Sequence, residues 1–265
     1  MGGKNKLEIA YEDESLIVVK KPSGLSVNTS KTTINIETLE DILRKMYPGL
    51  FKKNIYTRKD EENYLVSIDG NIYNKRDEFI SRAGIVHRLD KETSGLIIVA
   101  KNVEDFINLQ KQFLSKRVDK RYIALTYGKP KDLDVGDTFV VNAPIGRSPR
   151  NRTKFAINAS GKEAITNFKW LKIFNPDIGE FSLFECIPVT GRTHQIRVHL
   201  TAMNMPIVGD KLYSGAKKYL KNIDLFNRQF LHSYSLKFRH PKTNKVIKVE
   251  YSIPLDLKKI IESLK

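Results

Sequence analysis

Residues 86–100 decide the fold, and they read Val-His-Arg-Leu-Asp-Lys-Glu-Thr-Ser-Gly-Leu-Ile-Ile-Val-Ala. Residues 95–100 are a continuous apolar run that follows a polar loop, which predicts a buried strand. Asp90 lies in that loop, between the basic residues Arg88 and Lys91. Because a buried strand holds the loop before it rigidly, this position suits a functional carboxylate. An aspartate that caps a turn or forms a surface ion pair is the ordinary alternative.

Outward from this stretch, helical and strand patterns follow one another without strict alternation. Apolar residues recur at helical spacing in residues 36–46, 103–116 and 255–264. Short β-branched or alternating runs predict further strands at residues 16–19, 122–127, 138–145, 164–174, 181–189 and 245–253. Strands outnumber helices, so we expect an α+β fold with a mixed, mostly antiparallel central sheet and flanking helices and loops. A Gly-rich phosphate loop is missing, which argues against a doubly wound parallel sheet and a nucleotide cofactor.

The charge of the chain indicates a polyanionic partner. Its 265 residues include 46 Lys and Arg but only 30 Asp and Glu, a formal net charge of +16. Nucleic acid, an anionic membrane surface and acidic proteins all fit this composition. A hydrophobic fraction of 40% suffices for a core and excludes a disordered chain. The one cysteine, Cys186, cannot form an internal disulfide, and no segment resembles a signal peptide, so we expect a cytoplasmic protein.

Two further segments concentrate polar side chains. Residues 190–200 alternate apolar and polar residues in a way that fits either a strand or a helix, and they contain His194 and His199. That histidine spacing, with no carboxylate nearby, fits no usual metal site, so we expect no metal. A second segment holds four cations in eight residues, and these suit phosphate contacts, although a solvated turn is an equal alternative: Arg147, Arg150, Arg152 and Lys154.

Residues 84–96 carry a resemblance to a known family. They read Gly-Ile-Val-His-Arg-Leu-Asp-Lys-Glu-Thr-Ser-Gly-Leu, which closely resembles the catalytic-aspartate motif of RNA pseudouridine synthases of the RluA type. The resemblance continues in family order at residues 11–13, 19–25, 120–124, 144–147, 161–164, 190–200, 208–210 and 230–233. These blocks span nearly the whole chain.

The resemblance implies a fold, a reaction and a partner. It implies the pseudouridine synthase catalytic fold as a single domain over residues 1–265, with a polar insertion at about 49–80 and no separate S4 domain. It also implies isomerisation of specific uridines in ribosomal or transfer RNA, in which the N-glycosidic bond breaks and the rotated uracil reattaches through carbon. We expect RNA as the partner, no cofactor, no membrane, no protein partner and a monomeric chain.

The family motifs also imply roles for individual residues. Asp90 matches the catalytic aspartate, acting as nucleophile or base, and Tyr122 matches a tyrosine that stacks on the uracil and assists proton removal. Without the resemblance, the position of Tyr122 favours a core strand residue. Arg197 matches the basic partner of the aspartate, with Arg192 as its competitor. The remaining expected RNA contacts are Arg88, the four cations of residues 147–154, Arg192, His194 and Leu231. Arg88 is expected to fill the place of the extracted nucleotide, and binding of phosphate or balancing of the Asp90 charge is its alternative. Leu231 is expected as an apolar pocket wall, with which a packing role is equally consistent.

Two other readings remain at this point. A non-catalytic RNA-binding or ribosome-assembly protein on the same scaffold would explain the charge, and a nucleoside-cleaving enzyme would use the same sugar chemistry but release free uracil. Basic and aromatic residues in the insertion suit RNA contacts, and a solvated insertion is equally compatible: Lys52, Lys53, Arg58, Lys59, Lys75, Arg76, Tyr56, Tyr64 and Tyr73.

Overall fold

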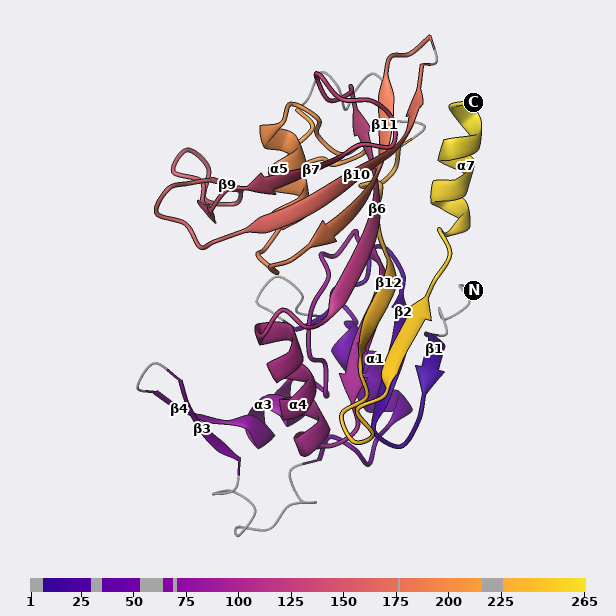
Figure 1. The fold of residues 1–265 in the computed structure, drawn as a ribbon. Helices are drawn as coiled ribbons and strands as arrows, with labels where there is room; N and C mark the ends of the chain where they lie inside the picture. Colours follow the sequence, from indigo (N-terminus) through magenta and orange to yellow (C-terminus); the bar gives the residue numbers. More distant parts are fainter. Residues whose placement is uncertain (1–6, 30–34, 53–63, 69–70, 176, 216–225) are drawn as a thin grey trace. The chain divides into compact units, whose positions relative to one another are not determined.

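The computed structural model describes residues 7–29, 35–52, 64–68, 71–175, 177–215 and 226–265. Its elements fall into two units, drawn as one chain in Figure 1. The first unit comprises Met1–Val118 and Lys237–Glu250, and the second comprises Asp119–Leu236 and Tyr251–Lys265. β12 (Leu231–Arg239) begins in the second unit and ends in the first.

The first unit is built around three antiparallel strands in the order β1-β2-β5: β1 (Glu8–Glu12), β2 (Leu16–Lys21) and β5 (Ser94–Ala100). Every residue of β5 is buried, as its continuous apolar run predicts. Gly84 lies against the end of this strand with a φ of 70°, where a Cβ atom would stand 2.2 Å from the Ala100 carbonyl oxygen. Only glycine fits this close approach, which starts the loop leading to Asp90.

Three helices and two hairpins complete the first unit. α1 (Leu39–Met46) begins at a capping box in which Thr38 and Asp41 bond each other's backbone N–H groups. α3 (Lys75–Ser81) and α4 (Val103–Leu114) begin at the caps Asn74 and Asn102 and contact each other. The expected polar insertion contains the antiparallel hairpin of β3 (Leu65–Ile68) and β4 (Asn71–Asn74), and β13 (Val246–Glu250) pairs with β12.

The second unit is a four-stranded antiparallel arrangement in the order β6-β11-β10-β7. Its strands are β6 (Asp119–Tyr127), β7 (Thr138–Asn142), β10 (Ile165–Phe174) and β11 (Phe181–Pro188). A short hairpin of β8 (Ile145–Arg147) and β9 (Phe155–Ile157) and two helices, α5 (Gln195–Ala202) and α7 (Leu255–Ser263), accompany them. An aromatic core fills this unit, with Phe139 stacked on Phe168 and Phe181 against Phe226.

The structure confirms the α+β class with mostly antiparallel strands and decides the segment left open by its sequence pattern. Residues 195–202 form a helix, because the buried Gln195 side chain bonds Thr190, Ile165, Thr166 and the Arg192 backbone at its start. The single strand expected at residues 138–145 is divided in the structure, since this range contains the whole of β7, which ends at Asn142, and the first residue of β8, Ile145. In the described ranges, no helix has the length and apolar character needed to cross a membrane.

Candidate active site

Asp90 lies in a tight turn directly before β5. Its carbonyl oxygen accepts the Thr93 N–H at 3.1 Å, its side chain is half-buried, and Arg88 beside it is exposed. The preceding residue, Leu89, is only 5% exposed and anchors the turn in the core. The expected arrangement of a polar loop presented by a buried strand is therefore observed.

A second loop, residues 21–25, holds the Asp90 loop through its main chain. The Lys21 side chain is fully buried, and its Nζ donates hydrogen bonds to the carbonyl oxygens of Pro22 at 2.9 Å, Leu25 at 2.8 Å and Lys91 at 3.0 Å. Gly24 N–H also donates to the Lys91 carbonyl, and Ser23 Oγ to the Glu92 carbonyl. Hydrogen bonds from a charged donor are stronger than neutral ones, so the backbone next to Asp90 is held firmly.

His87 connects the same loop to β5 and α4. Its Nε2 accepts the Ile98 N–H at 3.0 Å, so this nitrogen carries no proton. The ring also stacks on Phe113 of α4 with centroids 4.6 Å apart. The loop before Asp90 therefore has side-chain as well as main-chain anchors.

In the second unit, Arg197 of α5 forms a buried ion pair with Asp210. Its Nε and Nη2 donate to the two carboxylate oxygens at 2.7 and 3.0 Å, and the residues are only 8% and 1% exposed. Asp210 follows Gly209, which has a φ of 72°. A Cβ atom at Gly209 would stand 2.0 Å from the Arg228 carbonyl oxygen, so no larger residue fits there. This bidentate geometry fixes the plane and position of the guanidinium group.

Tyr213 joins the surroundings of Arg197 to the basic hairpin. Its ring lies under the guanidinium of Arg197, 4.9 Å from the centroid, and under the ammonium of Lys154 at 5.9 Å. Its hydroxyl oxygen accepts the Phe155 N–H and lies 2.9 Å from His194 Nδ1. His194 and Lys154, both expected to contact RNA, are thus brought together with Arg197 around one tyrosine.

Tyr122 and Lys120 lie two residues apart on β6 and share one face of the strand. Tyr122 is half-buried and packs against the hydrophobic core. Lys120 is only 8% exposed, and its Nζ donates to the Thr190 carbonyl at 3.2 Å. Burial lowers the pKa of Lys120 to about 8, since desolvation disfavours the ammonium more than the nearby Asp119 favours it.

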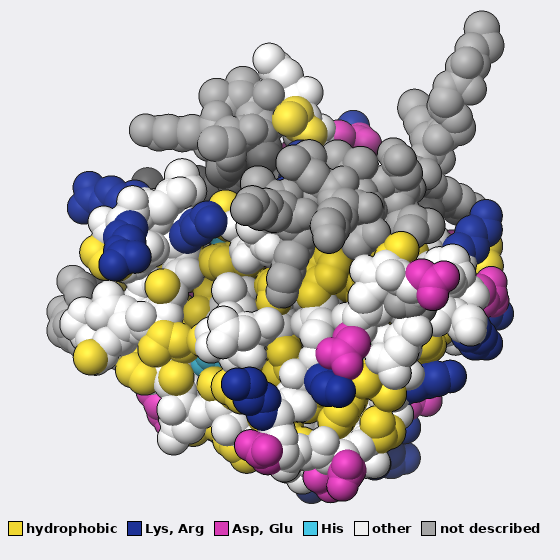
Figure 2. Space-filling model, turned by 90° about the horizontal axis from the view of Figure 1, so that it is seen from above, with side chains coloured by type: hydrophobic (Ala, Val, Ile, Leu, Met, Phe, Trp, Pro, Cys, Tyr) yellow, Lys and Arg dark blue, Asp and Glu magenta, His cyan; other side chains and the backbone are white. Residues whose placement is uncertain are grey.

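The other expected RNA contacts are distributed around the second unit. Arg150 and Arg152 are exposed on the loop between β8 and β9, whereas Arg147 stacks on Phe155 and bonds the Arg152 carbonyl. Arg192 is exposed and its Nε donates to the Glu163 carbonyl. Leu231, expected as a pocket wall, is 4% exposed and belongs to the core. On the face shown in Figure 2, Lys and Arg side chains occur in several separate groups.

Other polar residues singled out in the sequence have local structural partners. His199 is buried, with its ring nitrogens near Thr166 Oγ1 at 2.9 Å and the Ala143 carbonyl at 3.1 Å, and burial lowers its pKa. Within the described residues, no three His, Cys, Asp or Glu side chains gather as they would around a metal ion. In the insertion, Lys75 pairs with Glu78 and Arg76 is buried, while Lys53, Tyr56, Arg58 and Lys59 lie outside the described residues, as do residues 217–221.

Four residues gain importance from the structure although their motifs suggested no role for them: Lys21, Lys120, Asp210 and Tyr213. Lys21 and Lys120 are signalled by their positions within strand patterns, where a charged residue needs a special partner. Asp210 is 13 residues away from Arg197, a separation that no helical or strand period would connect.

Comparisons with known proteins show the family of the chain. The family model described as "RNA pseudouridylate synthase" matches residues 15–202. The chain is 35% identical to the uncharacterized RNA pseudouridine synthase YlyB of Bacillus subtilis over 98% of its own length and 73% of the relative. It is 33% identical to the ribosomal large subunit pseudouridine synthase D of Xanthomonas campestris, over 98% of this chain and 70% of that protein.

A solved structure shares the fold. The human RNA pseudouridylate synthase domain containing 1 superposes with a TM-score of 0.65 at 23% identity, over 100% of this chain and 96% of that one. The buried strand, the loop that precedes it and the family match over residues 15–202 lead to one conclusion. The chain belongs to the RNA pseudouridylate synthase family and is an isomerase that converts uridine in RNA to pseudouridine.

Proposed function

We propose that this enzyme isomerises specific uridines of ribosomal or transfer RNA and that Asp90 is its catalytic carboxylate. The observation that carries the proposal is the anchoring of the Asp90 loop by the buried Lys21 ammonium and the neighbouring main chain. A reacting carboxylate must keep its position while the glycosidic bond breaks and reforms, and such anchoring provides that rigidity. The Xanthomonas campestris relative, which is named a ribosomal large subunit pseudouridine synthase, favours ribosomal RNA as the substrate.

Tyr122 is proposed to stack on the target uracil and to assist proton removal from its carbon. It is half-buried on β6, so its position is set by the sheet and not by a mobile loop. A base inside folded RNA must first leave its stack, which costs a few kcal/mol. The exposed guanidinium of Arg88 is proposed to occupy the vacated place.

Arg197 is proposed to act at the same nucleotide as a fixed cation. Its bidentate pair with Asp210 prevents rotation of the guanidinium, and the stack on Tyr213 restrains its other face. Arg150 and Arg152, on the exposed hairpin loop of the same unit, suit phosphate contacts.

Product analysis tests the proposal. Pseudouridines are mapped across total RNA from cells with and without the gene, and the purified enzyme is then incubated with RNA that lacks the modification. We expect one or a few positions to lose pseudouridine in the deletion strain and to regain it with the enzyme. Release of free uracil would assign a cleaving enzyme, and unchanged maps together with RNA binding would assign a non-catalytic RNA-binding protein.

A further inference from the structure

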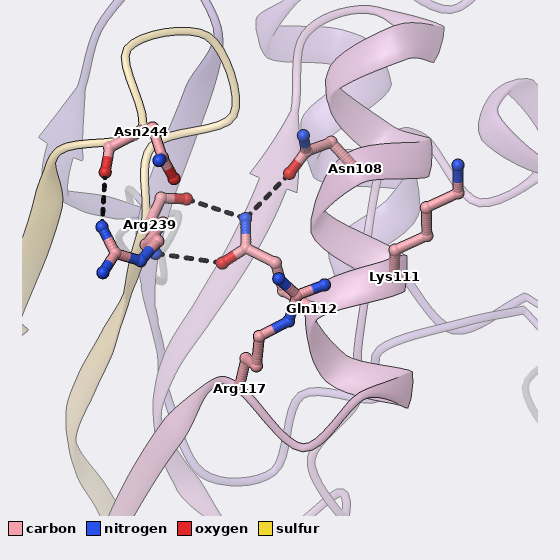
Figure 3. Close-up of a pocket in the computed structure, with 6 residues that line it drawn as sticks. All are labelled: Asn108, Lys111, Gln112, Arg117, Arg239 and Asn244. Atoms are coloured by element: carbon pink, nitrogen blue, oxygen red, sulfur yellow. Dashed lines mark hydrogen bonds between the residues drawn. The ribbon is translucent and has the colours of Figure 1, made fainter.

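A polar pocket lies in the first unit, on the last turns of α4 and the end of the β12–β13 hairpin (Figure 3). It encloses about 420 Å³, including the open space at its mouth. Its lining consists of three cations and three amides: Lys111, Arg117, Arg239, Asn108, Gln112 and Asn244. None of these residues belongs to the site described above.

The floor of the pocket is a fixed structure. Gln112 is 6% exposed, its Nε2 donates to Asn108 Oδ1 at 2.8 Å and to the Arg239 carbonyl at 2.9 Å, and its Oε1 accepts the Arg239 N–H at 3.0 Å. The Arg239 guanidinium also donates to the Asn244 carbonyl at 2.9 Å, across the hairpin. One buried amide therefore joins the helix to the hairpin and sets the spacing of the groups around it.

The two segments that form the pocket contain cations and no carboxylates. Residues 106–118 and 237–249 include eight Lys and Arg but no Asp or Glu, whereas the whole chain has 30 acids for its 46 basic residues. The acidic residues of α4, Glu104 and Asp105, lie in its first turn, at the opposite end from the pocket. The dipole of a helix favours basic residues over acidic ones at its C-terminus. Here the absence of acidic residues continues through the hairpin, so the helix dipole alone does not explain it.

The three cations of the lining are available to a ligand. Lys111, Arg117 and Arg239 are exposed, and in the described part of the chain none of them lies within ion-pair distance of a carboxylate. In the same hairpin, Lys248 does form such a pair, with Glu250 at 2.6 Å. Among the residues that the structure describes, the lining has no aromatic side chains for base stacking and no apolar ones for insertion into a membrane.

We propose that this pocket binds phosphate groups of the RNA backbone, outside the target nucleotide and independently of sequence. The proposal rests on the proposed function, because the RNA that it would hold is the substrate of the Asp90 site. α4 connects the two regions within one unit, since Phe113, next to Gln112, stacks on His87 of the catalytic loop. Cations supply the attraction to phosphate oxygens, and the amides of Asn108 and Asn244 supply neutral donors.

Salt-dependent RNA binding tests the proposal. The variant Lys111→Gln/Arg117→Gln/Arg239→Gln removes the three cations and leaves Gln112 and the Arg239 main chain in place. Its matched control, Lys258→Gln/Lys259→Gln/Lys265→Gln, removes the same charge from exposed residues at the C-terminal end of the chain. The Kd for a labelled RNA stem-loop of arbitrary sequence is measured for both over a series of KCl concentrations, and urea unfolding confirms that both are folded.

The slope of log K against log salt is negative, and we expect its magnitude to be smaller in the pocket variant by about 2 to 3. Each lost phosphate contact removes about 0.7 to 0.9 from that magnitude. We expect the control to lower it by less than half as much, and the exchange Lys111→Arg/Arg117→Lys/Arg239→Lys to retain it. Equal losses in the pocket and control variants, or an unchanged slope in the pocket variant, would overturn the proposal. Loss of binding to anionic lipid vesicles with unchanged RNA binding would also overturn it.

Pseudouridine formation is measured on the same samples to separate this proposal from the proposed function. At saturating RNA, we expect the pocket variant to keep its kcat while its KM rises. The binding assay contains no chemical step, so it decides the role of the pocket even if the wild-type enzyme forms no pseudouridine.

Discussion

A buried cation, Lys21, holds the Asp90 loop from the end of β2, and the helix α5 contains another, Arg197, and the polar partners of these two cations differ. Lys21, beside the Asp90 loop, donates to three main-chain carbonyls, whereas Arg197 is neutralised by the carboxylate of Asp210. In the first case the charge stabilises a backbone conformation. In the second case the carboxylate of Asp210 fixes the position of the Arg197 charge.

Lys120 is a third buried cation, and its hydrogen bonding offsets only part of the cost of burying its charge. It has nearly the burial of Lys21 but a single carbonyl acceptor among the described residues, and its pKa falls to about 8. A charge that lowers stability while lying beside a proposed substrate-stacking tyrosine is typical of a functional position. The three cations therefore differ in what their removal should do.

The largest effect on stability is expected for Asp210→Asn. This change removes the charge of the carboxylate that holds the buried Arg197 guanidinium in a bidentate pair, and breaking such a buried pair costs about 3 to 5 kcal/mol of unfolding free energy. Urea unfolding measures it. The double variant Arg197→Met/Asp210→Leu should recover most of that stability without activity, because a buried ion pair replaced by apolar residues is often neutral in stability. An Asp210→Asn protein as stable as the wild type would show that the pair contributes nothing.

Lys21→Met is expected to have the next largest effect. Three carbonyls lose a charged donor, and the cost is about 2 to 4 kcal/mol, accompanied by a lower kcat because the Asp90 loop is less firmly held. Lys20→Met is the matched control, since its pair with the 70% exposed Glu8 side chain lies at the surface and contributes about 0 to 1 kcal/mol. Equal effects of the two substitutions would refute the difference between the neighbouring lysines.

Lys120→Met should change the pH dependence of stability. The folded-state pKa of Lys120 is about 8, below its usual value of 10.5. Between these values the unfolded chain binds more protons, so the wild type gains stability as pH rises from 8 to 10.5, by roughly 3 kcal/mol. The methionine variant lacks this gain. We therefore expect it to be more stable than the wild type at pH 7 and to lose this advantage at higher pH, as measured by urea unfolding. Parallel pH profiles would contradict the pKa.

The smallest effect on stability, near zero, is expected for Arg150→Gln/Arg152→Gln. Both side chains are exposed on the β8–β9 loop, so their loss should appear only in RNA binding. If each contacts one phosphate, the magnitude of the negative slope of log K against log salt should fall by about 1.4 to 1.8. Unchanged salt dependence with unchanged KM would show that this loop does not contact RNA.

Much of the fold follows from local sequence patterns, and the exceptions have physical reasons. The buried strands β2 and β5 and the helices α1 and α4 were predictable because their apolar residues have a clear period or form a continuous run. β12 escaped prediction because polar residues, among them His232, Ser233 and Ser235, occupy buried positions in it and obscure the apolar pattern. β1 is short and mostly exposed, so it has no such pattern either.

The candidate site also has a part that could be predicted from the sequence and a part that could not. The Asp90 loop was predictable because its motif is continuous in sequence, whereas the Arg197–Asp210 pair depends on a tertiary contact across a turn. Tyr213 could not be predicted because its role comes from contacts with two other segments, α5 with its cap (Arg197 and His194) and the β8–β9 loop (Lys154). The geometry of a site that joins separate elements has no periodic signal in the sequence.

The central claim, that Asp90 carries the isomerisation, is tested most directly by Asp90→Asn. The exchange preserves the size of the side chain, and the Asp90 contact with Thr93 uses only its main chain. We expect the purified variant to fold and to bind RNA with a Kd within a few-fold of the wild type, but to form no pseudouridine in a single-turnover assay on RNA that the wild type modifies. Pseudouridine formation by the variant at the wild-type rate would contradict the claim.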